Sequence, residues 1–219
     1  MEGLAPFRLP DGPPAMYYVP EFLTAEQEAR YVAKIAGNER AWVTLSNRRL
    51  QMYGGTPSDK GMAATPLPGW LMEVVKQLRK HEYTTDALNH VLVNEYAPGQ
   101  GIMAHEDGPL YTPHFAIVSQ QSALLLDFFR KGDEPLSERF ETSVYLEPRS
   151  ALIISEAAYT DYLHGIEARM DDELDPARIC NFREHFPRGE RVARQPRISM
   201  TIRQVRKTIS TSKLFGARK

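Results

Sequence analysis

The chain has 219 residues, of which 42% are hydrophobic and 25% charged, enough apolar material for one domain with a sizeable core. Lysine and arginine total 27 against 28 aspartate and glutamate, and the formal net charge of -1 excludes a protein that coats nucleic acid through a bulk positive field. The single cysteine, Cys180, cannot form an internal disulfide, which indicates a reducing compartment. No segment resembles a secretory signal or a membrane span, so we expect a soluble monomer of the cytoplasm and nucleus.

The first part of the chain reads as an irregular segment over 1–15 followed by an N-terminal extension over 16–88. The extension is expected to hold a short strand over Met16–Val19 and two packing helices. Thr24 and Gln27 form a capping box that begins the first helix, which ends at Gly37. The second helix is expected over 66–80, with an apolar stripe on one side.

From residue 89 the hydrophobic pattern becomes extended, and residues 89–207 are expected to form the core of a single domain over 16–207. Short strands separated by turns rich in proline and glycine indicate a mainly β fold with flanking helices, a sandwich or a barrel. There is no room between the strands for repeated crossover helices. The expected strands cover 91–96, 115–120, 123–129, 141–146, 151–154, 159–164 and 198–205.

Charge is uneven in the last third of the chain. An acidic loop spans 167–175, and a run rich in arginine and lysine spans 188–219, with a basic tail over 208–219. The basic run is either a solvated face or a nucleic-acid contact. Two roles are open for the long insert between His164 and Arg197 that contains this loop and Cys180: gating the pocket or repelling a phosphate backbone.

The sequence His105-Glu106-Asp107 is the first sign of chemistry. Residues two apart on an extended segment share a face, so the imidazole of His105 and the carboxylate of Asp107 offer two neighbouring ligands. A distant histidine would complete the set of two histidines and one carboxylate that binds Fe(II) and leaves positions open. Among the other histidines, His164 is the best candidate because it lies in an apolar extended segment; the rest are His81, His90, His114 and His185.

A second sign is strict alternation in the segment 197–203. It places two arginines and two hydroxyls on one face, which are Arg197, Ser199, Thr201 and Arg203. Buried guanidinium groups require an anionic partner, and a dicarboxylate would supply one; the alternative is an edge strand with its polar face in water. Asn94 and Tyr96 likewise share a face of an expected strand and would hydrogen-bond a carboxylate or keto oxygen.

These pieces, in this order, resemble the AlkB-type Fe(II)- and 2-oxoglutarate-dependent dioxygenases. The matching motifs are Asn94-x-Tyr96-x-Pro98-Gly99, His105-x-Asp107, His164-Gly165-Ile166 and Arg197-x-Ser199-x-Thr201-x-Arg203. Residues 89–111 are similar to one animal member in particular. The resemblance covers roughly residues 16–207 and implies a double-stranded β-helix, a jelly-roll barrel flanked by the N-terminal helices.

The resemblance also implies roles for individual residues. His105, Asp107 and His164 would bind Fe(II), and Arg197 would pair with the distal carboxylate of 2-oxoglutarate. The rest of this cosubstrate would meet Asn94, Tyr96, Ser199, Thr201 and Arg203. The implied reaction consumes O2, converts 2-oxoglutarate to succinate and oxidises an N-methyl group on DNA or RNA, which leaves as formaldehyde.

Residues 47–55 lie where this family carries its nucleotide-recognition lid. Arg48, Arg49, Gln51 and Tyr53 would stack on a base and contact a phosphate; the alternative is an ordinary hairpin with exposed arginines. Tyr111 is a further candidate for substrate contact, at the end of an apolar turn where base-repair members tend to place polar groups. Two other functions fit the same residues, a nucleic-acid-binding module with little demethylase activity and a protein hydroxylase.

Overall fold

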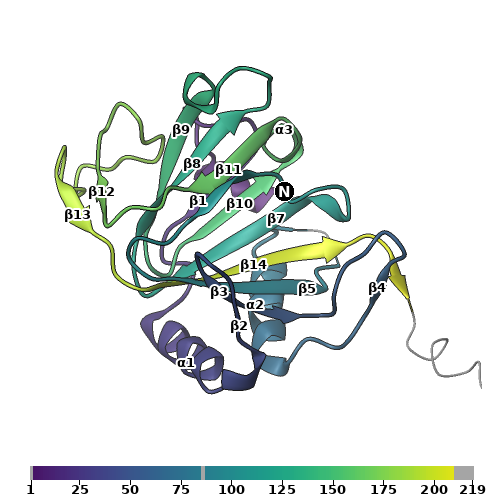
Figure 1. Cartoon of the computed structure of the whole chain (residues 1–219). Helices are drawn as coiled ribbons and strands as arrows, with labels where there is room; N and C mark the ends of the chain where they lie inside the picture. Colours follow the sequence, from purple (N-terminus) through teal and green to yellow (C-terminus); the bar gives the residue numbers. More distant parts are fainter. Residues whose placement is uncertain (1, 85–86, 210–219) are drawn as a thin grey trace, which may run out of the picture.

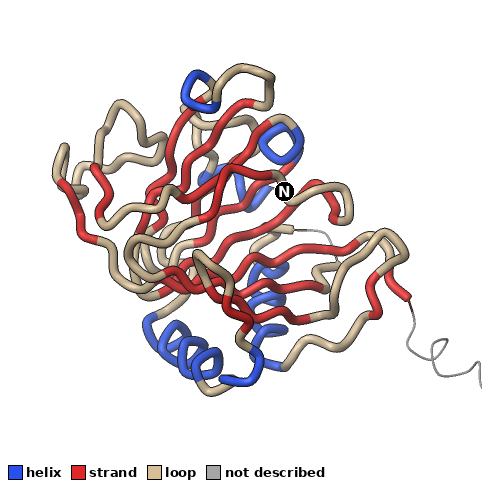
Figure 2. Tube along the Cα trace, viewed as in Figure 1, coloured by secondary structure: helices blue, strands red, loops and turns tan. Residues whose placement is uncertain are grey.

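The computed structural model describes residues 2–84 and 87–209, and it consists mainly of strands, with its two long helices together on one side (Figure 2). The larger sheet has seven antiparallel strands. In spatial order these are β1 (Met16–Val19), β10 (Ala151–Ser155), β7 (Tyr111–Gln120), β14 (Arg197–Val205), β5 (His90–Tyr96), β3 (Arg49–Tyr53) and β2 (Val43–Thr44).

The smaller sheet has four antiparallel strands and packs against one face of the larger sheet (Figure 1). Its order is β6 (Ile102–His105), β11 (Tyr162–Ile166), β8 (Leu124–Arg130) and β9 (Phe140–Leu146). Two short pairs complete the described strands, namely β12 (Asp171–Glu173) with β13 (Arg191–Ala193) and β4 (Met62–Ala63) with β15 (Thr208–Ile209). The prediction of a mainly β fold is confirmed.

Two long helices cover the outer face of the larger sheet (Figure 1). The first, α1 (Ala25–Ala36), begins at the predicted capping box of Thr24 and Gln27. The second, α2 (Gly69–Lys80), begins three residues later than predicted because Pro68 serves as its N-cap residue in an extended conformation. The short helices are η1 (Glu2–Phe7), η2 (Glu39–Ala41), η3 (Leu136–Glu138) and α3 (Glu156–Thr160).

Alternation along the strands of the larger sheet divides the core into two layers. On β14, Ile198, Met200 and Ile202 point toward the helices and join their apolar residues. On the same strand Arg197 and Arg203 point toward the smaller sheet. Between the sheets an apolar cluster that includes Phe115, Leu126 and Leu146 surrounds this polar face. The functional side chains therefore lie inside the sandwich.

Residues 167–196 connect β11 of the smaller sheet to β14 of the larger one, and we call them the 167–196 insert. It packs on the outer face of the smaller sheet, where its Leu174 and Ile179 meet Leu125 of β8. Backbone bonds join it to edge strand β9 at Ser143, whose amide donates to Arg178 and whose carbonyl accepts from Cys180. The insert thus covers an exposed sheet edge.

Several elements differ from the sequence-based expectations. Residues 2–7 form η1 rather than an irregular segment. Strand β7 begins at Tyr111 and contains Pro113, which is tolerated because its pairing with β14 shifts register there. Strand β11 begins only at Tyr162 because α3 precedes it. Within the described ranges no helix is long and apolar enough to span a membrane, and residues 210–219 of the expected basic tail lie outside them.

Replacing Thr24 with alanine removes one half of the capping box and leaves an N-terminal amide of α1 without its acceptor. We expect the free energy of unfolding to fall by about 1 kcal/mol, measured by urea denaturation with an unchanged slope. Lys34→Ala, at the other end of the helix, serves as the control and should change stability by less than about 0.5 kcal/mol. Equal effects of the two substitutions would contradict the capping role.

Candidate active site

The structure brings together three side chains predicted as metal ligands. Strand β6 pairs with β11 so that His105 lies opposite His164, and Asp107 follows two residues after His105. One potential ligand atom from each of the three side chains lies within 4.8 Å of the others. None of the other four histidines belongs to this cluster among the described residues.

Two glycines allow β6 to approach β11 closely. A Cβ atom on Gly165 would stand 2.8 Å from the backbone nitrogen of Ala104, and one on Gly101 would stand 2.2 Å from the carbonyl oxygen of Ile166. Either distance is shorter than side chains tolerate, so the pairing that sets His105 against His164 requires glycine at both positions.

Hydrogen bonding orients the ring of His105, and burial sets the charge of His164. The Nδ1–H of His105 donates to the carbonyl oxygen of Met103 at 2.8 Å, which leaves Nε2 as the free lone pair. The ring of His164 packs between Phe115 and Phe128, and loss of solvent lowers its pKa to about 4. At neutral pH His164 is therefore uncharged and able to coordinate.

The carboxylate of Asp107 has one oxygen engaged and one available. Oδ1 accepts from Nη1 of Arg203 at 3.0 Å, whereas Oδ2 is buried and has no hydrogen-bond partner in the described part of the chain. An unpartnered buried carboxylate oxygen is costly unless a cation binds it. Two imidazoles and this oxygen form the donor set that suits Fe(II), so the residues present fit that metal.

Tyr111 lies behind Arg203 rather than in the cavity. The guanidinium carbon of Arg203 stands 4.6 Å from the centre of the Tyr111 ring, and the buried ring of His90 lies 5.6 Å from that ring. Tyr111 is buried and absent from the cavity wall. The ring of Tyr111 supports the arginine that holds Asp107, and a contact of Tyr111 with substrate stays a prediction.

Arg197 is the buried cation of the site. Its Nη2 donates to Oγ of Ser119 at 2.8 Å, but its Nε has no partner, and no carboxylate pairs with it among residues 2–84 and 87–209. Burial lowers the pKa of the guanidinium to about 10, so it stays charged at neutral pH. A buried, charged guanidinium with spare donors fits the carboxylate of a cosubstrate.

All six residues predicted to bind cosubstrate line one cavity of about 270 Å³ together with the metal ligands. The register explains the convergence, because Ser199 of β14 lies between Asn94 of β5 and Ser119 of β7, so that the three point the same way. The set is Asn94, Tyr96, Arg197, Ser199, Thr201 and Arg203. Ser119 was missed in the sequence, although its alternation with Ile117 and Phe115 would have placed it on this face.

The four candidates from the lid region separate onto two faces of the hairpin. Arg48 lines the cavity, and its Nε donates to Oδ1 of Asn94 at 3.2 Å. Arg49 points the other way and forms a two-pronged ion pair with Glu95 at 2.6 and 2.8 Å.

Gln51 and Tyr53 share the face of Arg49 and do not line the cavity. The amide of Gln51 is fully buried and donates to the carbonyls of Ile35 and Asn38, and the hydroxyl of Tyr53 donates to Gln51 at 2.6 Å. Period-two alternation along β3 causes the separation. These two side chains anchor the hairpin to the helical layer.

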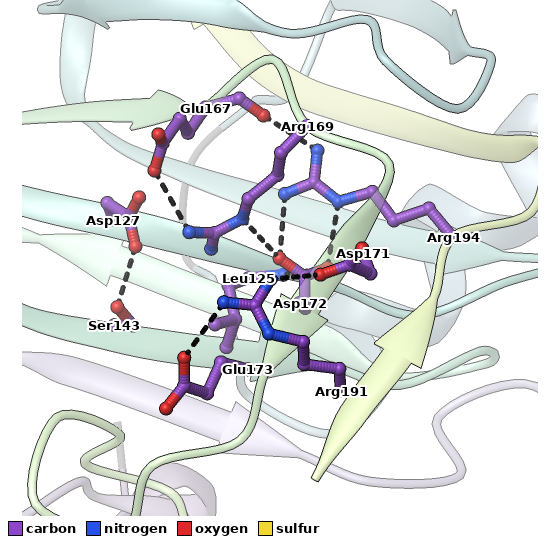
Figure 3. A network of polar contacts seen from close by, with 10 residues as sticks. All are labelled: Leu125, Asp127, Ser143, Glu167, Arg169, Asp171, Asp172, Glu173, Arg191 and Arg194. Atoms are coloured by element: carbon purple, nitrogen blue, oxygen red, sulfur yellow. Dashed lines mark hydrogen bonds and ion pairs between the residues drawn. The ribbon is translucent and has the colours of Figure 1, made fainter. Parts of the chain in front are cut away.

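Two arginines of the basic run pair with carboxylates of the acidic loop. On the paired strands β12 and β13, Arg191 meets Asp171 and Glu173, and Arg194 meets Asp172 (Figure 3). Arg197 and Arg203 of the same run point into the cavity. Leu174 of the acidic loop packs on the outer face of the smaller sheet, and the two roles raised for the insert stay hypotheses.

A family model described as the 2OG-Fe(II) oxygenase superfamily matches residues 15–203. The chain belongs to this superfamily. It is 38% identical over 215 residues to the zebrafish (Danio rerio) protein named probable RNA/DNA demethylase ALKBH6, covering 94% of this chain and 92% of that protein. The resemblance to the AlkB type, and to the sixth animal homologue in particular, is confirmed.

Two further relatives extend the comparison. The mouse (Mus musculus) protein named tRNA (carboxymethyluridine(34)-5-O)-methyltransferase ALKBH8 is 28% identical over 178 residues, covering 74% of this chain and 26% of that protein. The solved structure of OsALKBH1 superposes with a TM-score of 0.58 at 14% identity, covering 87% of this chain and 97% of that one. The predicted jelly-roll fold is thereby confirmed, and the protein is a dioxygenase that uses Fe(II), 2-oxoglutarate and O2.

Replacing Gly165 with alanine should separate β6 from β11 and pull His105 away from His164, because the new Cβ would meet backbone rather than a flexible side chain. We expect at least a tenfold loss of Fe(II) affinity, measured by anaerobic titration. Gly69→Ala is the matched control, since nothing lies within 4 Å of its Cβ position. Wild-type iron affinity in Gly165→Ala would show that the close approach is unimportant.

Replacing Arg197 with alanine removes the buried cation that faces the cosubstrate. Hydrogen bonds to charged groups contribute about 1.5–3 kcal/mol, so the affinity for 2-oxoglutarate should fall about 10- to 100-fold, measured by calorimetry on Mn(II)-loaded protein. Iron affinity should change little, because Arg197 does not contact the ligand cluster. An unchanged affinity for 2-oxoglutarate would remove Arg197 from the cosubstrate site.

Proposed function

We propose that the protein oxidatively demethylates N-methylated RNA or DNA, with Fe(II) and 2-oxoglutarate. The zebrafish relative is named a probable RNA/DNA demethylase and the mouse relative a tRNA-modifying enzyme, so nucleic acid is the first substrate class to consider. The observation that carries the proposal is the position of Arg48. It is a cation at the cavity wall that forms no ion pair within the described residues.

The charges of the cavity favour an anionic substrate. Its lining contains Arg48, Arg197 and Arg203 against Glu106 and Asp107. The three arginines and two carboxylates give a net charge of +1. Bound Fe(II) would add two positive charges and bound 2-oxoglutarate two negative charges, so the net charge of the occupied cavity stays at +1. Because Glu106 also pairs with Lys131 outside the cavity, the excess near Arg48 is larger still. A phosphodiester is an anion that would complete this balance.

The protein's own residues hold and separate the reacting groups. His105, Asp107 and His164 would hold Fe(II), while Arg197, with Ser119 behind it, would bind the distal carboxylate of 2-oxoglutarate. Bound together, iron and 2-oxoglutarate activate O2 for substrate oxidation. Leu126, Leu146 and Ile117 line the same cavity and exclude water from it.

The overall reaction accounts for all atoms. One oxygen atom of O2 enters 2-oxoglutarate, which becomes succinate and CO2. The other oxygen atom is added to the N-methyl carbon, which becomes a hydroxymethyl group. The carbon–nitrogen bond of that group then breaks, giving formaldehyde and a nitrogen that keeps the hydroxyl proton. No base from the protein is required at this last step.

Two alternatives are outcomes of the same experiment. A protein hydroxylase would couple succinate production to a peptide and not to nucleic acid. A binding module would bind oligonucleotides without releasing formaldehyde. The complete ligand cluster and the mutual pairing of the acidic and basic segments give no specific support to either.

Arg48→Ala and Arg49→Ala form a matched pair, because the two arginines are adjacent and point to opposite faces of the hairpin. With a methylated oligonucleotide, Arg48→Ala should raise the KM for the oligonucleotide about tenfold, a loss typical of a charge-assisted contact. Arg49→Ala should leave it within about twofold. The measurement is formaldehyde release across a panel of methylated RNA, DNA and peptides.

Succinate production without any nucleic acid should be equal in the wild type and in Arg49→Ala. Formaldehyde from a methylated peptide and none from any oligonucleotide would refute the proposal. So would oligonucleotide binding without turnover in protein that still converts 2-oxoglutarate.

A further inference from the structure

The cluster around Asp172 connects the two halves of the active site. Asp172 is 2% exposed, and its two oxygens accept from Arg194 through Nε and Nη2, both at 2.8 Å. Oδ1 also accepts from Nε of Arg169 at 2.8 Å, and Oδ2 from the amide of Leu125 at 3.3 Å (Figure 3). One carboxylate thus binds two guanidinium groups and a strand of the smaller sheet.

The cluster lies where the 167–196 insert leaves one sheet and enters the other. Arg194 stands three residues before Arg197, and its Nη1 donates to the carbonyl oxygen of Glu167, three residues after His164, at 2.7 Å. The amide of Arg194 donates to Met170 at 2.9 Å. These two hydrogen bonds therefore join the two ends of the insert to each other.

Strands β11 and β14 belong to different sheets and are not hydrogen-bonded neighbours. His164 sits on the first strand and Arg197 on the second, so no sheet ladder fixes the distance between the iron ligand and the arginine of the cosubstrate site. The Arg194–Asp172–Arg169 cluster connects these strands next to the site. In addition, the carbonyl of Arg169 accepts from the amide of Gly99, three residues after Tyr96.

The cluster is too well satisfied to be an accidental surface contact. Arg194 is 3% exposed, and Arg169 also pairs with the carboxylate of Glu167 at 2.9 Å, so the two arginines face two carboxylates. A buried charge set of this kind is weak evidence for stability and stronger evidence for a fixed geometry. By contrast, Arg191 on the same hairpin is 69% exposed and only touches Asp171 and Glu173.

We propose that Asp172, Arg169 and Arg194 are positioning residues, which set the start of β14 so that Arg197 meets the distal carboxylate of 2-oxoglutarate bound at His105, Asp107 and His164. None of the three contacts the cosubstrate cavity. Their effect is transmitted through the backbone from Arg194 to Arg197. The inference depends on 2-oxoglutarate as cosubstrate and not on the identity of the substrate that is oxidised.

The test variant is Arg194→Lys, which keeps the positive charge but cannot donate simultaneously to both oxygens of Asp172 and to Glu167 in the guanidinium geometry. Arg191→Lys on the same hairpin is the matched control. We expect Arg194→Lys to weaken 2-oxoglutarate binding to Mn(II)-loaded protein about tenfold by calorimetry, with Mn(II) affinity within about twofold of wild type. Arg191→Lys should leave both within about twofold.

Turnover gives an independent measurement. In succinate formation without added substrate, Arg194→Lys should raise the KM for 2-oxoglutarate by the same factor and leave kcat nearly unchanged. Arg169→Lys, whose side chain is 28% exposed, provides a milder variant if Arg194→Lys folds poorly, and should weaken binding about threefold.

Two results would overturn the proposal. One is wild-type affinity for 2-oxoglutarate in folded Arg194→Lys and Arg169→Lys. The other is a loss of Mn(II) and 2-oxoglutarate affinity together, in step with a lower melting temperature, which would assign the cluster to stability alone. Both results are obtained without nucleic acid and leave the proposed demethylation untouched.

Discussion

The ion pair between Arg203 and Asp107 is the interaction on which the rest of the site depends. Asp107 follows β6 of the smaller sheet, and Arg203 lies on β14 of the larger one, so the 3.0 Å contact joins the sheets at the metal cluster. It engages one carboxylate oxygen and leaves Oδ2 free for a metal ion. The same arginine is held from behind by Tyr111. This one ion pair thus fixes the positions of a metal ligand, Asp107, and of a predicted cosubstrate contact, Arg203.

Strand β14 supplies cavity-lining residues along most of its length. Its polar face presents Arg197 and Arg203 to the cavity, while its other face packs against the helical layer. Near its first residue, Arg194 joins Asp172 beside the smaller sheet, and toward its end Arg203 joins Asp107. Arg203–Asp107 therefore joins the sheets directly, whereas Arg194–Asp172 lies within the insert and reaches the smaller sheet through the amide of Leu125.

Much of the site could be predicted from the sequence because it obeys period-two alternation and motif order. The polar face of residues 197–203, the shared face of Asn94 and Tyr96, and the ligand set with His164 all follow from that pattern. The same rule, applied to β3, would have separated Arg48 from Gln51 and Tyr53. Composition left the basic run as either a solvated face or a nucleic-acid contact. Two of its arginines, Arg191 and Arg194, instead pair with an acidic loop about 20 residues away, a pairing that no local pattern reveals. Domain limits and cellular location stay predictions.

Anaerobic addition of Fe(II) and then 2-oxoglutarate to the purified chain, followed by the charge-transfer absorption of the chelate, tests the central claim most directly. The structure predicts one iron per chain, an absorption band that appears only with both components, and loss of that band in His164→Ala. A band of wild-type intensity in His164→Ala, or none in the unaltered protein, would contradict a site built by His105, Asp107 and His164 across the two sheets.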